Sequence, residues 1–164
     1  MTIRDSMPTQ TSTDTFGFDE GIHSKGLKST LADDKFSDFT FIVEGTKVSA
    51  HKALLASRSE VLSEIFDAND EEKEKEIANI TDASKSSFEN FLNFLYTDEL
   101  EIHDNIADYL YLANKFNVPG VKEKCEEVLA HQLKDSTSVD TYKYVFRYKL
   151  SQELKVNSFK FIQK

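Results

Sequence analysis

The hydrophobic pattern of this chain begins with the two-residue period of a β-strand. Phe39, Phe41 and Val43 occupy alternate positions, and Glu44-Gly45 follows them as a turn signal before a second short run. Alternating positions on both sides of a glycine turn are typical of a hairpin. The stretch therefore predicts two paired strands.

The segments on either side of this hairpin have helical spacing. Before it, Leu27, Leu31 and Phe36 fall on one side of a short helix. After it come two short helices, the second of which is expected to start at Ser57. Ser57 and Glu60 match a capping box, in which each side chain accepts a hydrogen bond from the other residue's free backbone N–H.

The acidic run from Asp67 to Glu76 predicts a solvated loop or a fraying helix end, and the four residues after it predict a short strand. From Ser84 onward the pattern is helical. Ser86 and Glu89 match a second capping box. The most regular apolar stripe of the chain follows, at Phe88, Phe91, Leu92, Leu95 and Tyr96.

Two more helices are separated at Pro119, because proline lacks the N–H that a helix interior needs and restricts the residue before it. Residues 134–164 then repeat the helical spacing and predict a helical extension. The last stripe continues to within two residues of the end, so this end is expected to pack on something absent or to have been cut from a longer protein. Residues 1–26 lack any sustained period and predict a flexible leader.

Length and cysteine usage place these elements in one domain and in a reducing compartment. A chain of 164 residues favours a single domain that buries about two-thirds of its unfolded surface. The single cysteine, Cys125, cannot form an internal disulfide. We therefore expect a cytoplasmic location, a nuclear location, or both.

Charge argues against one class of partner and hydropathy against another. A net charge of -9 repels the phosphate backbone, and no basic stripe with interleaved aromatic residues offsets it, so no nucleic-acid binding is expected. The chain has no apolar run near the roughly 20 residues that span a bilayer, and no signal-peptide layout. No membrane partner is expected either.

The chain also lacks a recognisable catalytic motif. Its four histidines, His23, His51, His103 and His131, are scattered, and neither a metal-ligand spacing nor a phosphate-binding glycine loop occurs. We expect no enzyme, no metal and no cofactor.

Two weaker candidate sites, a redox thiol and a cation site, have simpler structural interpretations. Cys125 is a candidate redox thiol, but it lies on an apolar stripe, which favours burial in the core. Asp70, Glu71 and Glu72 are candidate ligands of a divalent cation. The interleaved Lys73 favours a solvated acidic face instead.

In order and spacing, these segments resemble the BTB/POZ domain over about residues 27–133. The resemblance is closest to the speckle-type POZ protein group, whose MATH-BTB members are dimeric substrate adaptors for cullin ubiquitin ligases. It implies an α+β fold with a short β-sheet flanked by a cluster of α-helices, and a start of a BACK-like segment at 134–164. The motifs that carry it are Ser37-Asp38-Phe39, Ala50-His51-Lys52, Leu55-Ala56-Ser57-Arg58-Ser59, Phe94-Leu95-Tyr96-Thr97, and Leu112-Ala113 followed by Cys125.

The resemblance implies a two-fold homodimer. Asp38 and Lys52 are expected to form an acid-base pair at or near its interface, and His51 to close the hairpin against the helices. An ordinary surface ion pair is the alternative for Asp38 and Lys52, and packing within one chain is the alternative for the first helix. The full set of expected interface residues is Leu27, Leu31, Phe36, Asp38, Lys52, Leu54 and Leu55.

The resemblance also implies a cullin-binding surface, made by one helix, the loop after it and the end of a later helix. Its expected residues are Glu64, Phe66, Asp67, Asn69, Asp70, Glu72, Tyr96, Thr97 and Asp98. The chain departs from the family at Asp70, because many cullin-binding members carry an apolar residue two positions before a glutamate there. A dimerisation module of a transcriptional regulator or cytoskeletal protein, without cullin binding, is therefore the alternative function. In either case substrate recognition is expected in domains outside this chain.

Overall fold

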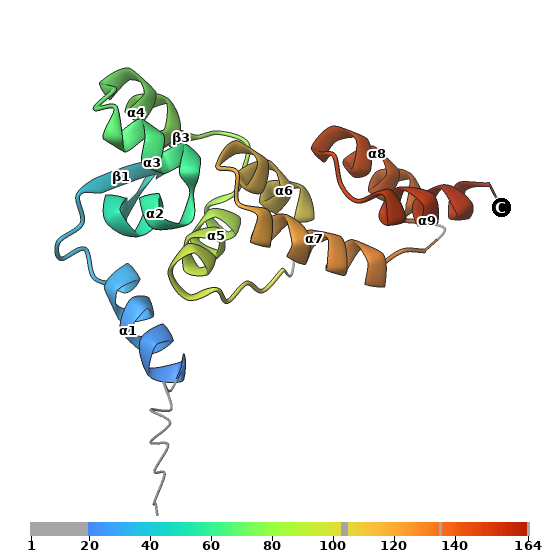
Figure 1. Cartoon of the computed structure of the whole chain (residues 1–164), viewed down its shortest axis with the longest axis horizontal. Helices are drawn as coiled ribbons and strands as arrows, with labels where there is room; N and C mark the ends of the chain where they lie inside the picture. The colour runs from blue at the N-terminus through green and yellow to red at the C-terminus, as the bar shows by residue number, and fades with distance from the viewer. Residues whose placement is uncertain (1–19, 103–104, 135, 164) are drawn as a thin grey trace, which may run out of the picture.

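The computed structural model describes residues 20–102, 105–134 and 136–163, so most of the expected leader lies outside the described residues. A small sheet is surrounded by helices, and the last two helices lie at the end of the molecule far from α3 and α4 (Figure 1). The α+β prediction is confirmed. The elements are α1 (Glu20–Ala32), β1 (Phe39–Val43), β2 (Thr46–Ala50), α2 (Lys52–Arg58), α3 (Glu60–Asp67), α4 (Glu71–Ala78), β3 (Asn79–Ile80), α5 (Lys85–Thr97), α6 (Ile106–Lys115), α7 (Pro119–His131), α8 (Ser138–Tyr148) and α9 (Gln152–Ile162).

The predicted hairpin is confirmed. β1 and β2 pair antiparallel, with Val43 opposite Thr46, and Glu44 and Gly45 both have positive φ, at 50° and 74°. Such a two-residue turn matches the twist of the flanking strands. β3 joins β1 in parallel, with Val43 opposite Ile80, and completes a sheet in the order β2-β1-β3.

The first helix is displaced from its prediction. α1 begins at Glu20, seven residues before Leu27, and ends at Ala32, so Phe36 lies outside it. Leu27 and Leu31 are half-buried against the core, and α1 packs on α5. Part of the surface of these two leucines is therefore covered within one chain, as the alternative to a dimer contact predicts.

Both predicted capping boxes are wrong by two residues. Ser59, not Ser57, caps α3 by accepting a hydrogen bond from the Leu62 N–H at 3.2 Å. Ser57 lies inside α2, where its hydroxyl donates to the Leu54 carbonyl at 2.7 Å. Likewise Ser84, not Ser86, caps α5.

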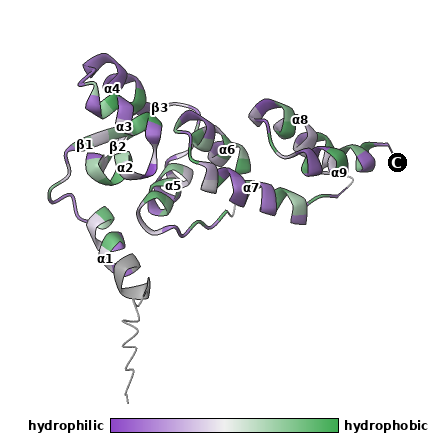
Figure 2. Ribbon diagram, in the orientation of Figure 1, coloured by the Kyte–Doolittle hydropathy of each residue, from purple (hydrophilic) through white to green (hydrophobic). Residues whose placement is uncertain are grey.

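The acidic run is a helix rather than a loop. Asp70 caps α4 by accepting from the Lys73 N–H at 3.2 Å. Glu71, Glu72 and Glu74 lie in the first turn, where carboxylates stabilise the positive end of the helix dipole. Figure 2 shows α4 mostly hydrophilic, and its buried Ile77 fixes it to the core.

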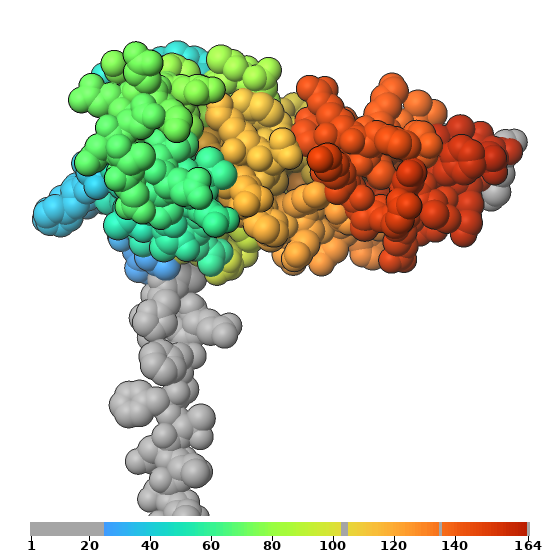
Figure 3. Space-filling view, turned by 45° about the horizontal axis from the view of Figure 1, so that its top comes forward, coloured from blue at the N-terminus to red at the C-terminus, as the bar shows by residue number. Residues whose placement is uncertain are grey.

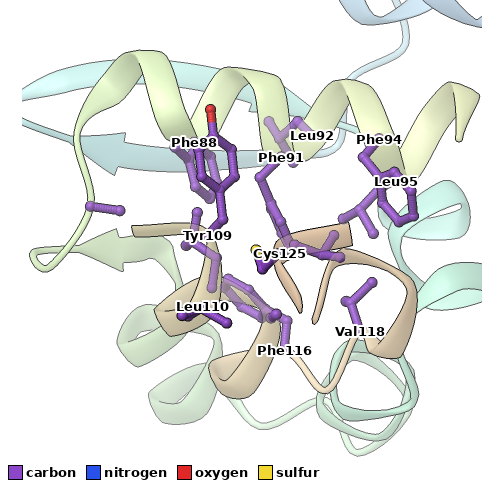
Figure 4. Close-up of a cluster of buried hydrophobic side chains, with 14 of the residues drawn as sticks. Phe88, Phe91, Leu92, Phe94, Leu95, Tyr109, Leu110, Phe116, Val118 and Cys125 are labelled. Carbon is purple, nitrogen blue, oxygen red and sulfur yellow. The ribbon is translucent and has the colours of Figure 1, made fainter. Parts of the chain in front are cut away.

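The core lies between the sheet, α5 and the helices α6 and α7. Side chains of α5 such as Phe88 and Phe91 point toward α6 and α7, with Cys125 among them (Figure 4). Cys125 has no exposed surface, and burial raises its pKa to about 12, so its expected place in the core is confirmed.

Pro119 is the first residue of α7, where its missing N–H has no intrahelical partner to lose. α6 already ends at Lys115, before Asn117 with its positive φ of 47°. The extension is helical as predicted, in α8 and α9. Val145 and Leu154 are buried there, but other members of the same stripes remain exposed: Val139, Phe146, Phe159 and Ile162.

Candidate interaction surfaces

His51 ties three parts of the chain together. Its backbone N–H donates to the Tyr96 hydroxyl at 3.0 Å, its Nδ1 lies 2.9 Å from the same oxygen, and its Nε2 lies 3.3 Å from the Lys35 carbonyl oxygen. Burial raises the pKa of Tyr96, which is only 4% exposed. His51 is therefore structural, and Tyr96 has too little surface to serve as the expected cullin contact.

Asp38 and Lys52 do not form the expected side-chain pair within the chain. The Asp38 Oδ1 accepts from the backbone N–H of Lys52 at 2.7 Å and so caps the start of α2. The Lys52 ammonium instead pairs with the Glu74 carboxylate of α4 at 2.7 Å. The motif is thus used for capping, and its lysine side chain belongs to the side of α3 and α4.

This ion pair belongs to a cluster of four residues, which we call the Lys52 cluster. The Lys52 Nζ lies 5.1 Å from the centre of the Phe66 ring and 5.7 Å from that of Phe39. The two rings meet edge to face, 5.2 Å apart. Phe39, Lys52, Phe66 and Glu74 come from four separate elements, so no local spacing could have indicated this contact.

Phe36 is the most exposed of the large hydrophobic side chains described, at 82%. It has a positive φ of 68° in a turn closed by the Ser37 N–H and the Asp34 carbonyl at 3.1 Å. A bulky residue in this region costs about 1–2 kcal/mol. The segment between α1 and β1, light blue in Figure 3, projects from the surface and presents this ring to solvent.

The two leucines predicted beside it have different positions. Leu54 is half-buried against the core. Leu55 has no exposed surface in the single chain, so its side chain belongs to the core, and its expected place in the interface stays a prediction.

The expected cullin surface is acidic and comes from two stretches of the chain. Glu64, Asp67, Asn69 and Glu72 are exposed on α3, α4 and the connection between them, which pack together. At the end of α5, Asp98 is exposed and pairs with Arg58 of α2. The half-buried Thr97 donates from its hydroxyl to the Asn93 carbonyl at 2.8 Å.

Comparison with known proteins identifies the architecture. The family model of the BTB/POZ domain matches residues 27–133. This chain belongs to the BTB/POZ family. A BTB/POZ domain is a protein-protein interaction module.

Two relatives illustrate the similarity of this BTB domain. TD and POZ domain-containing protein 3 of Mus musculus is 34% identical over 109 residues, which are 65% of this chain and 30% of that protein. Kelch-like protein 40 of Xenopus tropicalis is 28% identical over 129 residues, which are 78% of this chain and 21% of that protein. The chain thus spans less than a third of the length of these relatives.

A solved structure supports the fold. The BTB domain of zebrafish PATZ1 superposes with a TM-score of 0.56 at 24% sequence identity, covering 69% of this chain and 91% of that one. At this identity the similarity concerns the fold alone.

The structure gives a physical reason for the departure of this BTB domain at Asp70. The residue before a helix that accepts a backbone N–H needs an oxygen in its side chain, and Asp70 supplies it to α4. The hydrogen bond from the Lys73 N–H lowers the pKa of Asp70. Asp70 thus stabilises the end of the α3–α4 connection, where an apolar side chain could not cap.

The described residues show neither a metal centre nor a membrane helix. No group of three or more His, Cys, Asp or Glu among them is placed to hold a metal ion. Within the same part of the chain, no helix is both long and apolar enough to cross a bilayer.

Proposed function

We propose that this chain is a homodimeric BTB substrate adaptor that recruits a cullin scaffold to a ubiquitin ligase, as its resemblance to the speckle-type POZ protein group implies. Similarity to both a TD and POZ protein and a Kelch-like protein supports the BTB part of this proposal. The substrate would be bound by domains outside this chain.

The single observation that carries the dimer is the exposure of Phe36. Its aromatic ring is 82% exposed, on a turn with an unfavourable φ. Covering the ring with an apolar surface would lower the free energy. The half-buried Leu27 and Leu31 of the neighbouring α1 would extend that surface. A second copy offers the same residues through a two-fold axis.

The proposed cullin surface consists of the exposed residues of α3, α4 and the end of α5. Its carboxylates suit basic groups on a scaffold, and most of the free energy of such an interface comes from a few apolar anchors. Phe66 is the candidate anchor, but Phe39 and Lys52 already cover part of its ring. Affinity would therefore be modest.

Calorimetry with a purified cullin N-terminal domain tests this function, with the molar mass of the free chain measured by light scattering. We expect a dimer that binds the scaffold. Phe36→Asp should lower the dimer fraction, whereas Val139→Asp, at a half-exposed residue of α8, should leave the mass unchanged. The dimer is contradicted if the free chain is a folded monomer, or if Phe36→Asp leaves the dimer fraction unchanged.

Asp70 favours the alternative function, a dimerisation module without cullin binding. Burying a carboxylate in an apolar pocket costs several kcal/mol unless it is paired or protonated. If this residue prevents binding, Asp70→Leu should create affinity for the cullin domain, whereas Asp70→Asn, which keeps a capping oxygen, should not. If the original chain and the Asp70→Leu variant are both folded dimers and neither binds the cullin domain, the result supports the assembly module.

A further inference from the structure

The pair α8 and α9 carries an apolar groove on its surface. The groove has a volume of about 420 Å³ and is lined by Tyr142, Gln152, Lys155, Val156, Phe159 and Lys160. The Tyr142 ring lies 5.8 Å from the Phe159 ring and 4.8 Å from the Phe146 ring, so the aromatic surface runs from one helix to the other. Phe146 is 55% exposed and Phe159 is 44% exposed.

These side chains are not used to hold the two helices on the domain. Val145, Tyr148 and Leu154 are buried and belong to the common core, while α8 contacts α6 and α9 contacts α7. The groove therefore presents a second apolar surface, in addition to the one that fixes the helix pair.

The rim of the groove is basic. The Lys155 Nζ lies 4.7 Å from the centre of the Phe146 ring, and Lys160 borders the groove on α9. Among the residues that the structure describes, neither ammonium pairs with a carboxylate. Residues 136–163 contain five Lys and Arg against two Asp and Glu, a net charge of +3, in a chain whose net charge is -9.

We propose that this groove, which we call the α8–α9 groove, binds an acidic amphipathic helix of a partner protein. Apolar side chains on one face of such a helix fit the aromatic floor, and flanking carboxylates meet Lys155 and Lys160. The aromatic floor needs apolar side chains to cover it, which favours an amphipathic protein helix over a nucleic-acid backbone as the occupant.

This inference is independent of the cullin proposal. The α8–α9 groove belongs to the end of the molecule formed by the red helices in Figure 3, whereas α3 and α4 lie toward the opposite end in Figure 1. A partner held there leaves α3, α4 and the end of α5 uncovered. The two binding events can therefore be measured separately.

Fluorescence anisotropy with two labelled synthetic helical peptides tests the proposal. One peptide carries leucines at every third or fourth position with flanking glutamates, and the matched peptide has lysines in place of the glutamates. We expect the acidic peptide to bind and the basic one not to bind. Lys155→Glu combined with Lys160→Glu, and separately Phe159→Ser, should each weaken binding at least about tenfold.

Ile42→Ser, on an exposed hydrophobic residue of β1, is the matched control and should leave peptide binding unchanged. The double lysine variant leaves the apolar side chains of the groove in place, so it keeps the test decisive if Phe159→Ser perturbs folding by circular dichroism. Equal binding of both peptides, or no change in the double variant, overturns the proposal. Self-association lost on Phe159→Ser assigns the groove to a second copy instead, and displacement of the peptide by phosphatidylserine vesicles assigns it to a lipid surface.

Discussion

The helices around the sheet and the two helices at the end of the chain use the same apolar spacing for different purposes. On α5, Phe88 and Phe91 have at most 1% of their surface exposed. On α8 and α9, Phe146 and Phe159 remain 55% and 44% exposed, although each belongs to an apolar stripe with helical spacing. A helical period thus predicts a helix with an apolar face, but it does not say what covers that face.

The largest expected effect tests this difference with one substitution in each region. Phe91→Ala removes a ring that stacks 5.7 Å from Phe116 in the core, and should lower the free energy of unfolding by about 3–5 kcal/mol. Phe146→Ala should lower it by less than about 1 kcal/mol, because the ring is already more than half exposed. Urea unfolding followed by circular dichroism measures both, and equal losses would contradict the contrast.

The next effect locates the stability of the terminal helices. Leu154 is 3% exposed on α9, so Leu154→Ala should cost about 2–4 kcal/mol by leaving a cavity. The loss should concentrate in α8 and α9, where amide hydrogen exchange would accelerate more than in α5. Val156→Ala, at a residue 48% exposed on the same helix, is the control. Uniform acceleration across all helices would mean that the terminal pair and the core unfold as one unit.

A smaller effect concerns how the core helices begin. Ser59→Ala removes the cap of α3 and the buried hydrogen bond from the Ser59 hydroxyl to the Phe116 carbonyl at 2.6 Å. We expect a loss of about 1–2 kcal/mol in thermal or urea unfolding. Ser57→Ala should change stability by less than about 0.5 kcal/mol, because its hydroxyl is exposed and caps no helix. A larger loss of stability for Ser57→Ala than for Ser59→Ala would instead support the predicted capping box at Ser57.

The smallest effect is the pH dependence of the α4 cap. The folded-state pKa of Asp70 lies below its ordinary value of 3.8, so the cap contributes fully above that pH and is lost as pH falls through the lowered value. Amide chemical shifts of Lys73 should follow this titration by NMR. Asp70→Asn should abolish the pH response while preserving α4, and an unchanged titration of the Lys73 amide would contradict the assignment.

Sequence predicted the elements far better than their boundaries. The alternation at Phe39 to Val43 and the stripe on α5 survive in the structure because both report burial against a continuous core. Boundaries failed where two serines lie two residues apart, because each has the hydroxyl that a cap needs and only the backbone decides between them. α4 was missed because its glutamates and lysines serve equally well in a solvated loop.

The candidate surfaces, too, could be predicted only in part. Phe36 could be singled out as an apolar residue outside the core, but its place on a turn beyond α1 was not visible in the spacing. The Lys52 cluster could not be predicted, because Phe39, Phe66 and Glu74 meet Lys52 only after the hairpin, α3 and α4 have packed. Leu55 and Tyr96 are buried in the single chain, because a family motif does not separate residues that shape a surface from residues that form it.

The hydrogen bond between His51 and the Lys35 carbonyl has a consequence for the entropy of association. Phe36 lies on a turn, and this hydrogen bond anchors the turn to the junction of β2, α2 and α5. The hydrogen bond from the Ser37 N–H to the Asp34 carbonyl closes the turn itself. Covering the ring would then immobilise one side chain, at about 0.5–1.5 kcal/mol, rather than order a whole loop. The turn is preorganised, so a partner that meets this face encounters Phe36 already in position.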